Sequence, residues 1–209
     1  MSKFLSKLHC TITAIDISPE MLYYFKKNLA SKIKKDKIKT IEGNAEEIHK
    51  FVRSVDKIIV ACAFWDMYTK SLLRNVSKIM DKKSELIFNL PALTIDEEKG
   101  VIYFFENSFR QEFPKANLYR RIDLTDLQNE LNKNGLKFRK IIPYSFYLQK
   151  NSIQYFFKVL RVRYPFIFLP DIPYNKAVKI CDKIFTKALD KTSKRGIKEE
   201  GKIFVIGKK

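Results

Sequence analysis

Glycine, histidine and cysteine are scarce in this chain of 209 residues, which contains six glycines, two histidines and three cysteines. Cys10, Cys62 and Cys181 lie far apart and form no Cys-x-x-Cys pair. With so few histidines, this spacing argues against a zinc site and favours reduced thiols. No apolar run approaches the ~18 residues of a membrane span, and the first residues lack the hydrophobic segment of a secretory signal. We therefore expect a cytoplasmic protein with no transmembrane segment.

The motifs of several common enzyme classes are also missing. The sequence contains no G-x-x-x-x-G-K-[ST] phosphate loop, no G-x-S-x-G nucleophile elbow and no H-E-x-x-H metal motif. The acidic pairs Glu46-Glu47 and Glu97-Glu98 are adjacent, so their side chains point apart on any helix and are typical of a solvated surface. These absences disfavour phosphate-loop enzymes, α/β-hydrolases and zinc peptidases.

Acidic residues are few relative to basic ones: 23 Asp and Glu stand against 41 Lys and Arg, a formal net charge of +18. Such a charge can attract nucleic acid or an anionic membrane. The 32 lysines far outnumber the 9 arginines, however, and are scattered from end to end. Because arginine is the usual residue for bidentate recognition of phosphates and bases, we favour solvated lysines on helix faces and do not expect a nucleic-acid partner.

What is present is an alternation of short β-rich runs with helical patterns. We predict strands at 10–16, 37–41, 56–63, 85–89, 136–147 and 201–207. We predict helices from Pro19, from 44 or 45 to 52, over 68–80, from a Thr125–Gln128 capping box to Gly135, and over 175–191. Pro91 should end the 85–89 strand. This alternation predicts one α/β domain over 1–209 with an open, mostly parallel Rossmann-like sheet, an irregular crossover at 92–122, and a helical insertion or cap at 150–196.

The segment Thr13–Leu22 carries the strongest functional signal. It is typical of a buried strand that ends in Asp16 and is followed at once by a helix, with Ser18 as N-cap and Pro19 in the first helical position. An acid at the carboxyl edge of such a strand can accept both hydroxyls of a nucleotide ribose. Asp16 can equally serve as a simple turn acid, so the segment by itself leaves both readings open.

Several segments in order resemble class I S-adenosylmethionine (SAM)-dependent methyltransferases. The matching stretches are Ala14-Ile-Asp-Ile-Ser-Pro-Glu-Met-Leu22, Ile41-Glu-Gly-Asn-Ala45, 55–65, 78–88, 124–138 and the terminal strand. The resemblance implies a transferase that uses SAM as its cofactor. It also implies that the terminal strand is the antiparallel seventh strand of that family.

The same resemblance implies roles for individual residues. Asp16 would hold the ribose hydroxyls, Ile17 would pack on the adenine face, and Asn44 and the Ala45 N–H would meet the adenine edge. The remaining predicted contacts follow the fourth strand of the family: Ala61 and Phe64 beside the donor, Trp65 and Asp66 beside the acceptor. Ile17 and Trp65 are equally compatible with ordinary core packing. No catalytic acid or base is assigned, because methyl transfer from an activated donor depends mainly on placement and desolvation.

The main departure from the family is at the front of the sequence. The family places a strand and a Gly-rich loop before the position of Asp16, and nothing here resembles them. In the family's strand order, 3-2-1-4-5-7-6, that missing strand is central. We therefore predict an N-terminally truncated methyltransferase domain that lacks the first strand, with exposed strand edges on both sides of it. The chain is a fragment, a degenerate relative, or a protein completed by a partner chain.

Two functions are compatible with these patterns. The first is SAM-dependent methylation of a small-molecule or lipid-like acceptor, with the aromatic-rich segment 144–174 as a substrate cap. These aromatics can instead simply pack the insertion on the sheet. The second is a non-catalytic binding subunit that uses its basic, aromatic C-terminal segment on a partner or a membrane surface.

Overall fold

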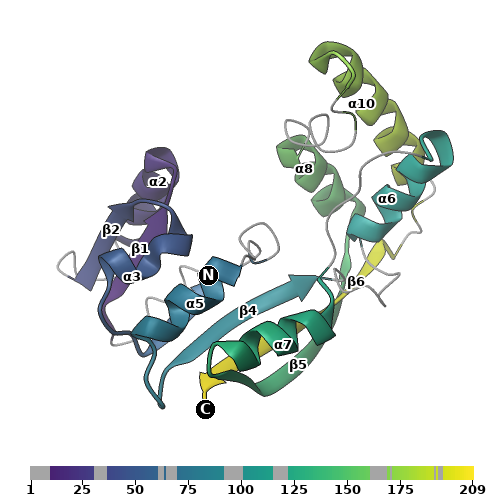
Figure 1. The fold of residues 1–209 in the computed structure, drawn as a ribbon. Coiled ribbons are helices and arrows are strands. Elements are labelled where there is room, and N and C mark those ends of the chain that lie inside the picture. The colour runs from purple at the N-terminus through teal and green to yellow at the C-terminus, as the bar shows by residue number, and fades with distance from the viewer. Residues whose placement is uncertain are drawn as a thin grey trace.

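The architecture comes from a computed structural model. It describes residues 10–30, 37–60, 64, 70–91, 101–114, 122–160, 169, 171–190, 192 and 195–209. Within these ranges, strands and helices alternate through most of the chain (Figure 1). None of the helices in these ranges is both long and apolar enough to cross a membrane. The predicted α/β class is confirmed.

The strands form two separate sheets. The first has two parallel strands, β1 (Ile12–Asp16) and β2 (Ile38–Glu42). The second has the order β3-β4-β6-β5, in which β3 and β4 are parallel and β6 is antiparallel to both of its neighbours. Its strands are β3 (Lys57–Val60), β4 (Glu85–Pro91), β5 (Leu136–Leu148) and β6 (Ile197–Lys208). The predicted antiparallel last strand is thus confirmed.

The sheet is interrupted between β1 and β3. β1 and β3 belong to different sheets, and no strand of the described ranges joins them. This is the position at which the resemblance places the missing first strand. Among the described residues, neither β1 nor β3 has a strand partner on its other side.

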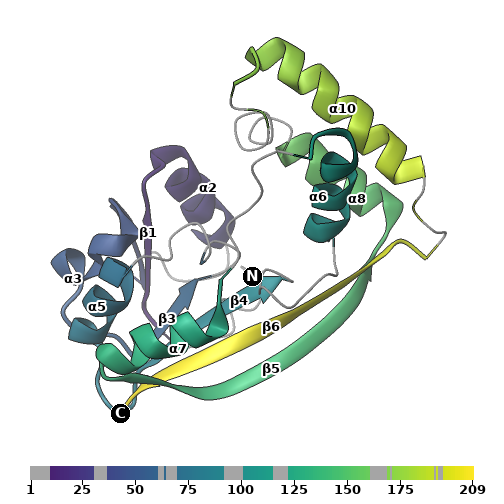
Figure 2. The same cartoon turned by 45° about the vertical axis from the view of Figure 1, so that its right-hand side comes forward.

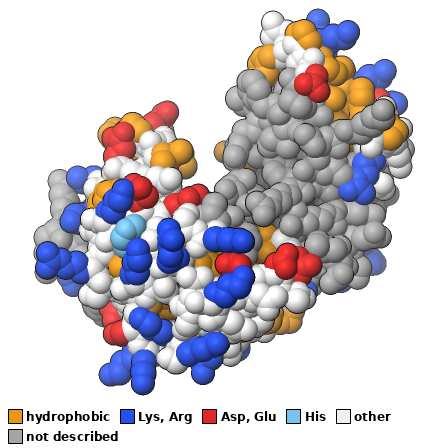
Figure 3. Space-filling view, viewed as in Figure 1, with side chains coloured by type: hydrophobic (Ala, Val, Ile, Leu, Met, Phe, Trp, Pro, Cys, Tyr) orange, Lys and Arg blue, Asp and Glu red, His pale blue; other side chains and the backbone are white. Residues whose placement is uncertain are grey.

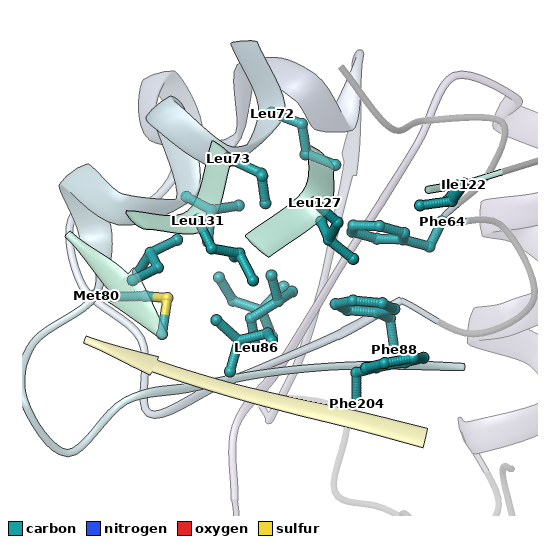
Figure 4. Packing of buried hydrophobic residues seen from close by; sticks show 14 of the residues in the cluster. Phe64, Leu72, Leu73, Met80, Leu86, Phe88, Ile122, Leu127, Leu131 and Phe204 are labelled. Atoms are coloured by element: carbon teal, nitrogen blue, oxygen red, sulfur yellow. The ribbon is translucent and has the colours of Figure 1, made fainter. Parts of the chain in front are cut away.

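One face of the larger sheet carries the main hydrophobic core. Helices α5 (Lys70–Ile79) and α7 (Leu124–Lys133) cover it with leucines that recur at helical spacing. Figure 4 shows the aromatic end of this core, where the rings of Phe64, Phe88 and Phe204 form a stack. The central sheet residues Leu86 and Phe88 are almost completely buried.

Helices flank the smaller sheet on both sides. Figure 2 shows β1 between α2 (Pro19–Ala30) and α3 (Ile48–Phe51). As predicted, Ser18 caps α2: its Oγ accepts a hydrogen bond from the Met21 N–H at 3.2 Å. A short 3₁₀ helix, η2 (Ala45–Glu47), precedes α3. Along α2, Leu22 and Leu29 are buried, whereas Met21 is exposed.

One local prediction was wrong, and one strand runs further than predicted. The N-cap of α7 is Asp123, whose carboxylate accepts hydrogen bonds from the N–H groups of Thr125 and Asp126, so Thr125 lies inside the helix. Aspartate at N-cap satisfies the same free N–H groups that the predicted capping box would have used. The 85–89 strand runs two residues further than predicted, but it ends at Pro91 as predicted, with Pro91 opposite Gly201 of β6.

A second, smaller core holds the cap. Helices α6 (Val101–Glu112), α8 (Lys150–Leu160) and α10 (Tyr174–Asp190) contribute buried side chains to it. In α10, Ala177, Cys181, Ile184 and Phe185 are buried. The cap is not built from 150–196 alone, because Phe109 of α6 packs edge-on against Phe185. Tertiary packing therefore adds part of the predicted crossover to the cap.

The reactivity of the Cys181 thiol provides a test of cap packing. Burial, with a smaller contribution from Asp182, raises its pKa to about 12. Compared with an ordinary thiol of pKa ≈ 8.5, this leaves about a thousandfold less thiolate at pH 8. In the variant Cys10→Ser/Cys62→Ser we expect Cys181 to resist a disulfide-exchange reagent until guanidinium unfolds the cap. Equal labelling rates in the folded and unfolded chains at one pH would contradict this packing.

A buried serine ties the start of β4 to the segment before β3. Ser84 is 1% exposed, and its Oγ lies 2.6 Å from the Val55 carbonyl oxygen and 2.9 Å from the Asp81 N–H nitrogen. We expect Ser84→Ala to lower the free energy of unfolding by about 1–3 kcal/mol, because both groups lose a buried partner. Urea denaturation measures this change. Ser77→Ala is the matched control, because the Ser77 Oγ donates its hydrogen bond to the Arg74 carbonyl oxygen of the same helix. Its free energy of unfolding should change little.

Candidate functional site

The parallel pairing of β1 and β2 brings two predicted loops together. Asp16 lies opposite Glu42 in the register, and the Gly43 N–H donates a hydrogen bond to the Asp16 carbonyl oxygen at 3.0 Å. The turn after β1 and the turn after β2 therefore meet at one edge of the sheet. Gly43 also sits close against Phe51, since a Cβ at this position would lie 2.5 Å from that ring. We call this edge, formed by residues 16–18 and 43–45, the carboxyl-edge site.

Asp16 has a structural role at this edge. Its Oδ1 accepts a hydrogen bond from the Ser18 N–H at 2.8 Å, and the residue is half-buried. The turn function considered from the sequence is therefore present. The other carboxylate oxygen, Oδ2, accepts no hydrogen bond from any residue that the structure describes. One oxygen shapes the turn and the other is available to a ligand.

The neighbours of Asp16 combine an apolar surface with polar groups. Ile17 is 74% exposed, so it is not the ordinary core residue that the sequence left as an alternative. Asn44 is the N-cap of η2, and its Oδ1 accepts a hydrogen bond from the Glu46 N–H at 2.9 Å. That amide oxygen keeps a second lone pair for another donor. Ala45 is the first residue of η2, where helical N–H groups have no partner within the helix.

The predicted residues after β3 are only partly placed. Ala61, Trp65 and Asp66 lie outside the described residues. Phe64 is completely buried, and its ring stacks on Phe88 at a centroid distance of 3.7 Å with the planes within 5°. Its side chain thus belongs to the core in this structure, and contact with a ligand would fall to its backbone or require the ring to move.

Glu46 links the two sheets, which the sequence reasoning did not foresee. Its carboxylate accepts a hydrogen bond from the Ser71 hydroxyl at 3.0 Å, and its carbonyl oxygen accepts one from the side chain of buried Asn75 at 2.9 Å. The available signal was Asn75, a polar residue within the apolar stripe of α5. Glu46 follows the carboxyl end of β2, and Ser71 opens the helix that follows β3. This helix, α5, runs back to the amino edge of β4, because the Met80 carbonyl after it accepts a hydrogen bond from Lys208, next to the Gly207–Glu85 pair. The start of α5 and the carboxyl ends of β2 and β3 therefore lie at the same edge.

The cap lies beyond the same edge. β4 pairs with β6 from Gly207 to Gly201, and β6 and β5 continue past Pro91, the end of β4, to the Ile197–Leu148 pair at the base of the cap. The cap core contacts this pair. The carboxyl-edge site and the cap thus lie toward the same edge of the sheets.

Comparison with known proteins identifies the fold. Residues 1–83 match the family described as "Methyltransferase domain". A SAM-dependent methyltransferase from Thiobacillus denitrificans, in complex with S-adenosyl-L-homocysteine, superimposes with a TM-score of 0.58 at 10% identity, covering 100% of this chain and 79% of the other. The chain has the class I methyltransferase fold. A SAM-dependent methyltransferase from Geobacter sulfurreducens, also with S-adenosyl-L-homocysteine, gives a TM-score of 0.55 at 11% identity with the same coverage.

No curated protein sequence matches the chain. The observed strand orders, β1-β2 and β3-β4-β6-β5, fit the class I methyltransferase fold with its first strand left out. In this fold the carboxyl-edge site corresponds to the predicted adenosine contacts Asp16, Ile17, Asn44 and Ala45. The structure brings these four residues together at one edge; their roles remain predictions.

Proposed function

We propose that this chain is a SAM-dependent methyltransferase that modifies a small-molecule or lipid-like acceptor between the carboxyl-edge site and the cap. The methyltransferase-domain match and the shared fold support SAM as its cofactor. The observation that carries the proposal is the meeting of the Asp16 turn and the Asn44 turn, joined by the Gly43–Asp16 hydrogen bond. These two turns hold all the predicted contacts to adenosine.

The described residues suit the adenosine half of SAM. Oδ2 of Asp16 would accept the ribose hydroxyls while Oδ1 keeps the turn, the exposed Ile17 would cover one adenine face, and the Asn44–Ala45 turn would bond the adenine edge. Burial of Ile17 against a purine removes apolar surface from water, which is favourable by roughly 25 cal/mol per Å². Bound SAM would supply an already activated methyl group.

The acceptor would lie toward the cap. Ala61, Phe64, Trp65 and Asp66 follow β3 in the sequence, and the proposed acceptor contacts among them are Trp65 and Asp66. The cap is rich in apolar and aromatic side chains, which suits an apolar or lipid-like acceptor. The work of the protein residues would be to position the acceptor and exclude water.

Calorimetry tests the proposal. We expect saturable heat when SAM, or its product S-adenosyl-L-homocysteine, is titrated into the 209-residue chain. Adenosine should bind more weakly at the same site and compete, because its contacts are a subset of those of SAM. Absence of heat up to millimolar SAM would reject cofactor binding by this chain while leaving its fold assignment intact.

The binding-subunit alternative is favoured by one observation. Aromatic side chains near the cap are unusually exposed: Tyr155 is 71%, Phe146 49%, Tyr147 49% and Tyr174 40% accessible. Figure 3 shows basic side chains spread over the visible surface with acidic ones among them, without a single dense patch. Co-sedimentation with phosphatidylserine vesicles separates the alternatives. A membrane-binding subunit would pellet with the vesicles, and the variant Tyr155→Ser/Tyr174→Ser would no longer do so. The enzyme proposal requires no such binding.

A further inference from the structure

The interruption between β1 and β3 presents two unused strand edges. β1 has a hydrogen-bonding partner on its β2 side and β3 on its β4 side, and neither has a strand partner on its other side among the described ranges. Unpaired strand edges are templates for the addition of another strand. β2 and β5 also end their sheets, but each of them offers a single edge. Only the interval between β1 and β3 offers two edges to one segment.

The two edges run in the same direction. β1 is parallel to β2, and β3 is parallel to β4. The hydrogen bonds of Glu46 to Ser71 and Asn75 place the carboxyl ends of β2 and β3 at one edge, so β1 and β3 also run alike. A single strand lying between them could therefore bond both in parallel.

The side chains beside the interruption are incompletely covered. Strands of parallel sheets are normally buried on both faces. None of the five residues of β1 is buried, and Ile59 of β3 is 50% exposed, whereas Leu86, Phe88 and Leu90 of β4 are buried. The exposed Ile59 needs an apolar neighbour on its own face of the sheet. The segment that fits here has apolar side chains on both faces, as central parallel strands do.

We propose that an extended, apolar segment of another polypeptide inserts as a parallel strand between β1 and β3. β1 has five residues and β3 has four, so the inserted strand would be about five residues long. It would join the two sheets into the order β2-β1-insert-β3-β4-β6-β5. Its carboxyl end would lie at the edge that carries Asp16. The proposal depends on strand edges and burial and is independent of whether the chain binds SAM.

Hydrogen exchange tests the insertion. The probe is a synthetic peptide, Val-Ile-Val-Ile-Val between glutamate tags, which keep it soluble and suit the +18 chain. We expect amides of β1 and β3 that do not bond β2 or β4 to exchange fast in the chain alone. Saturating peptide should slow them at least about tenfold, as ladder hydrogen bonds form. A peptide with proline at its centre cannot donate there and should protect far less.

Two strand variants sharpen the result. Ile59→Asp should weaken peptide binding at least about tenfold, because a charge would then face the inserted apolar strand. Ile141→Asp is the matched control: Ile141 is 45% exposed on β5, and binding should be unchanged. Protection of the β1 and β3 edges before peptide is added would mean that this chain fills the interval itself. That result would overturn the proposal. So would peptide-induced protection of the outer edge of β5 equal to that of β1 and β3, or a homodimer in ultracentrifugation that depends on Ile59.

Discussion

Asp16→Ala is expected to weaken SAM binding by about 10- to 150-fold. The variant removes a carboxylate oxygen proposed to accept the ribose hydroxyls, and a hydrogen bond to a charged group contributes about 1.5–3 kcal/mol. Titration calorimetry measures the change. The effect should depend on the hydroxyls themselves. The native chain should therefore prefer adenosine to 2′,3′-dideoxyadenosine, and the alanine variant should lose most of that preference.

The turn role of Asp16 calls for a second substitution. Because Oδ1 already accepts the Ser18 N–H, alanine also removes a local hydrogen bond. Asp16→Asn keeps an oxygen for Ser18 but lacks the negative charge. If the carboxylate binds ribose, the asparagine variant loses affinity while its thermal midpoint stays near the native value. Full affinity in the asparagine variant would assign Asp16 to the turn alone, and full affinity in both variants would remove it from the site.

Phe88→Ala should cause the largest loss of stability in the described core. Phe88 is 1% exposed and lies between two aromatic rings, 3.7 Å from Phe64 and 5.2 Å from Phe204 between centroids (Figure 4). Truncating a buried phenylalanine typically costs 3–5 kcal/mol, from lost burial and the cavity left behind. A domain of this kind has a net stability of about 5–15 kcal/mol. The variant should therefore unfold at much lower urea concentration.

Two further variants keep this prediction testable if the alanine protein does not fold. Phe88→Leu retains most of the apolar volume, so its unfolding free energy should fall less than that of Phe88→Ala. The remaining loss includes the stacking with the two neighbouring rings, which contributes about 0.5–1.5 kcal/mol per pair. Phe146→Ala removes a ring that is 49% exposed on β5 and should change the unfolding free energy much less than Phe88→Ala. Equal losses at Phe88 and Phe146 would contradict the core assigned here.

Local signals identified most elements but not every end. Ser18 and Pro19 start α2 as predicted, and Gly135, at φ 67°, ends α7 in the left-handed conformation that glycine tolerates. The predicted cap at Thr125 is wrong because Asp123, two residues earlier, has the same capping chemistry. Pro91 ends β4 as predicted, although the strand runs two residues past 89.

The sequence by itself determined the order of strands and helices and the acid at the end of the first strand. Short-range capping, periodicity and turn chemistry depend on neighbours along the chain, so they could be read directly. Only the tertiary structure decided that Phe64 turns into the core, that α6 joins the cap, that Glu46 ties the sheets together and that Ile17 and Ile59 remain exposed. These outcomes depend on which distant side chains compete for the same buried space.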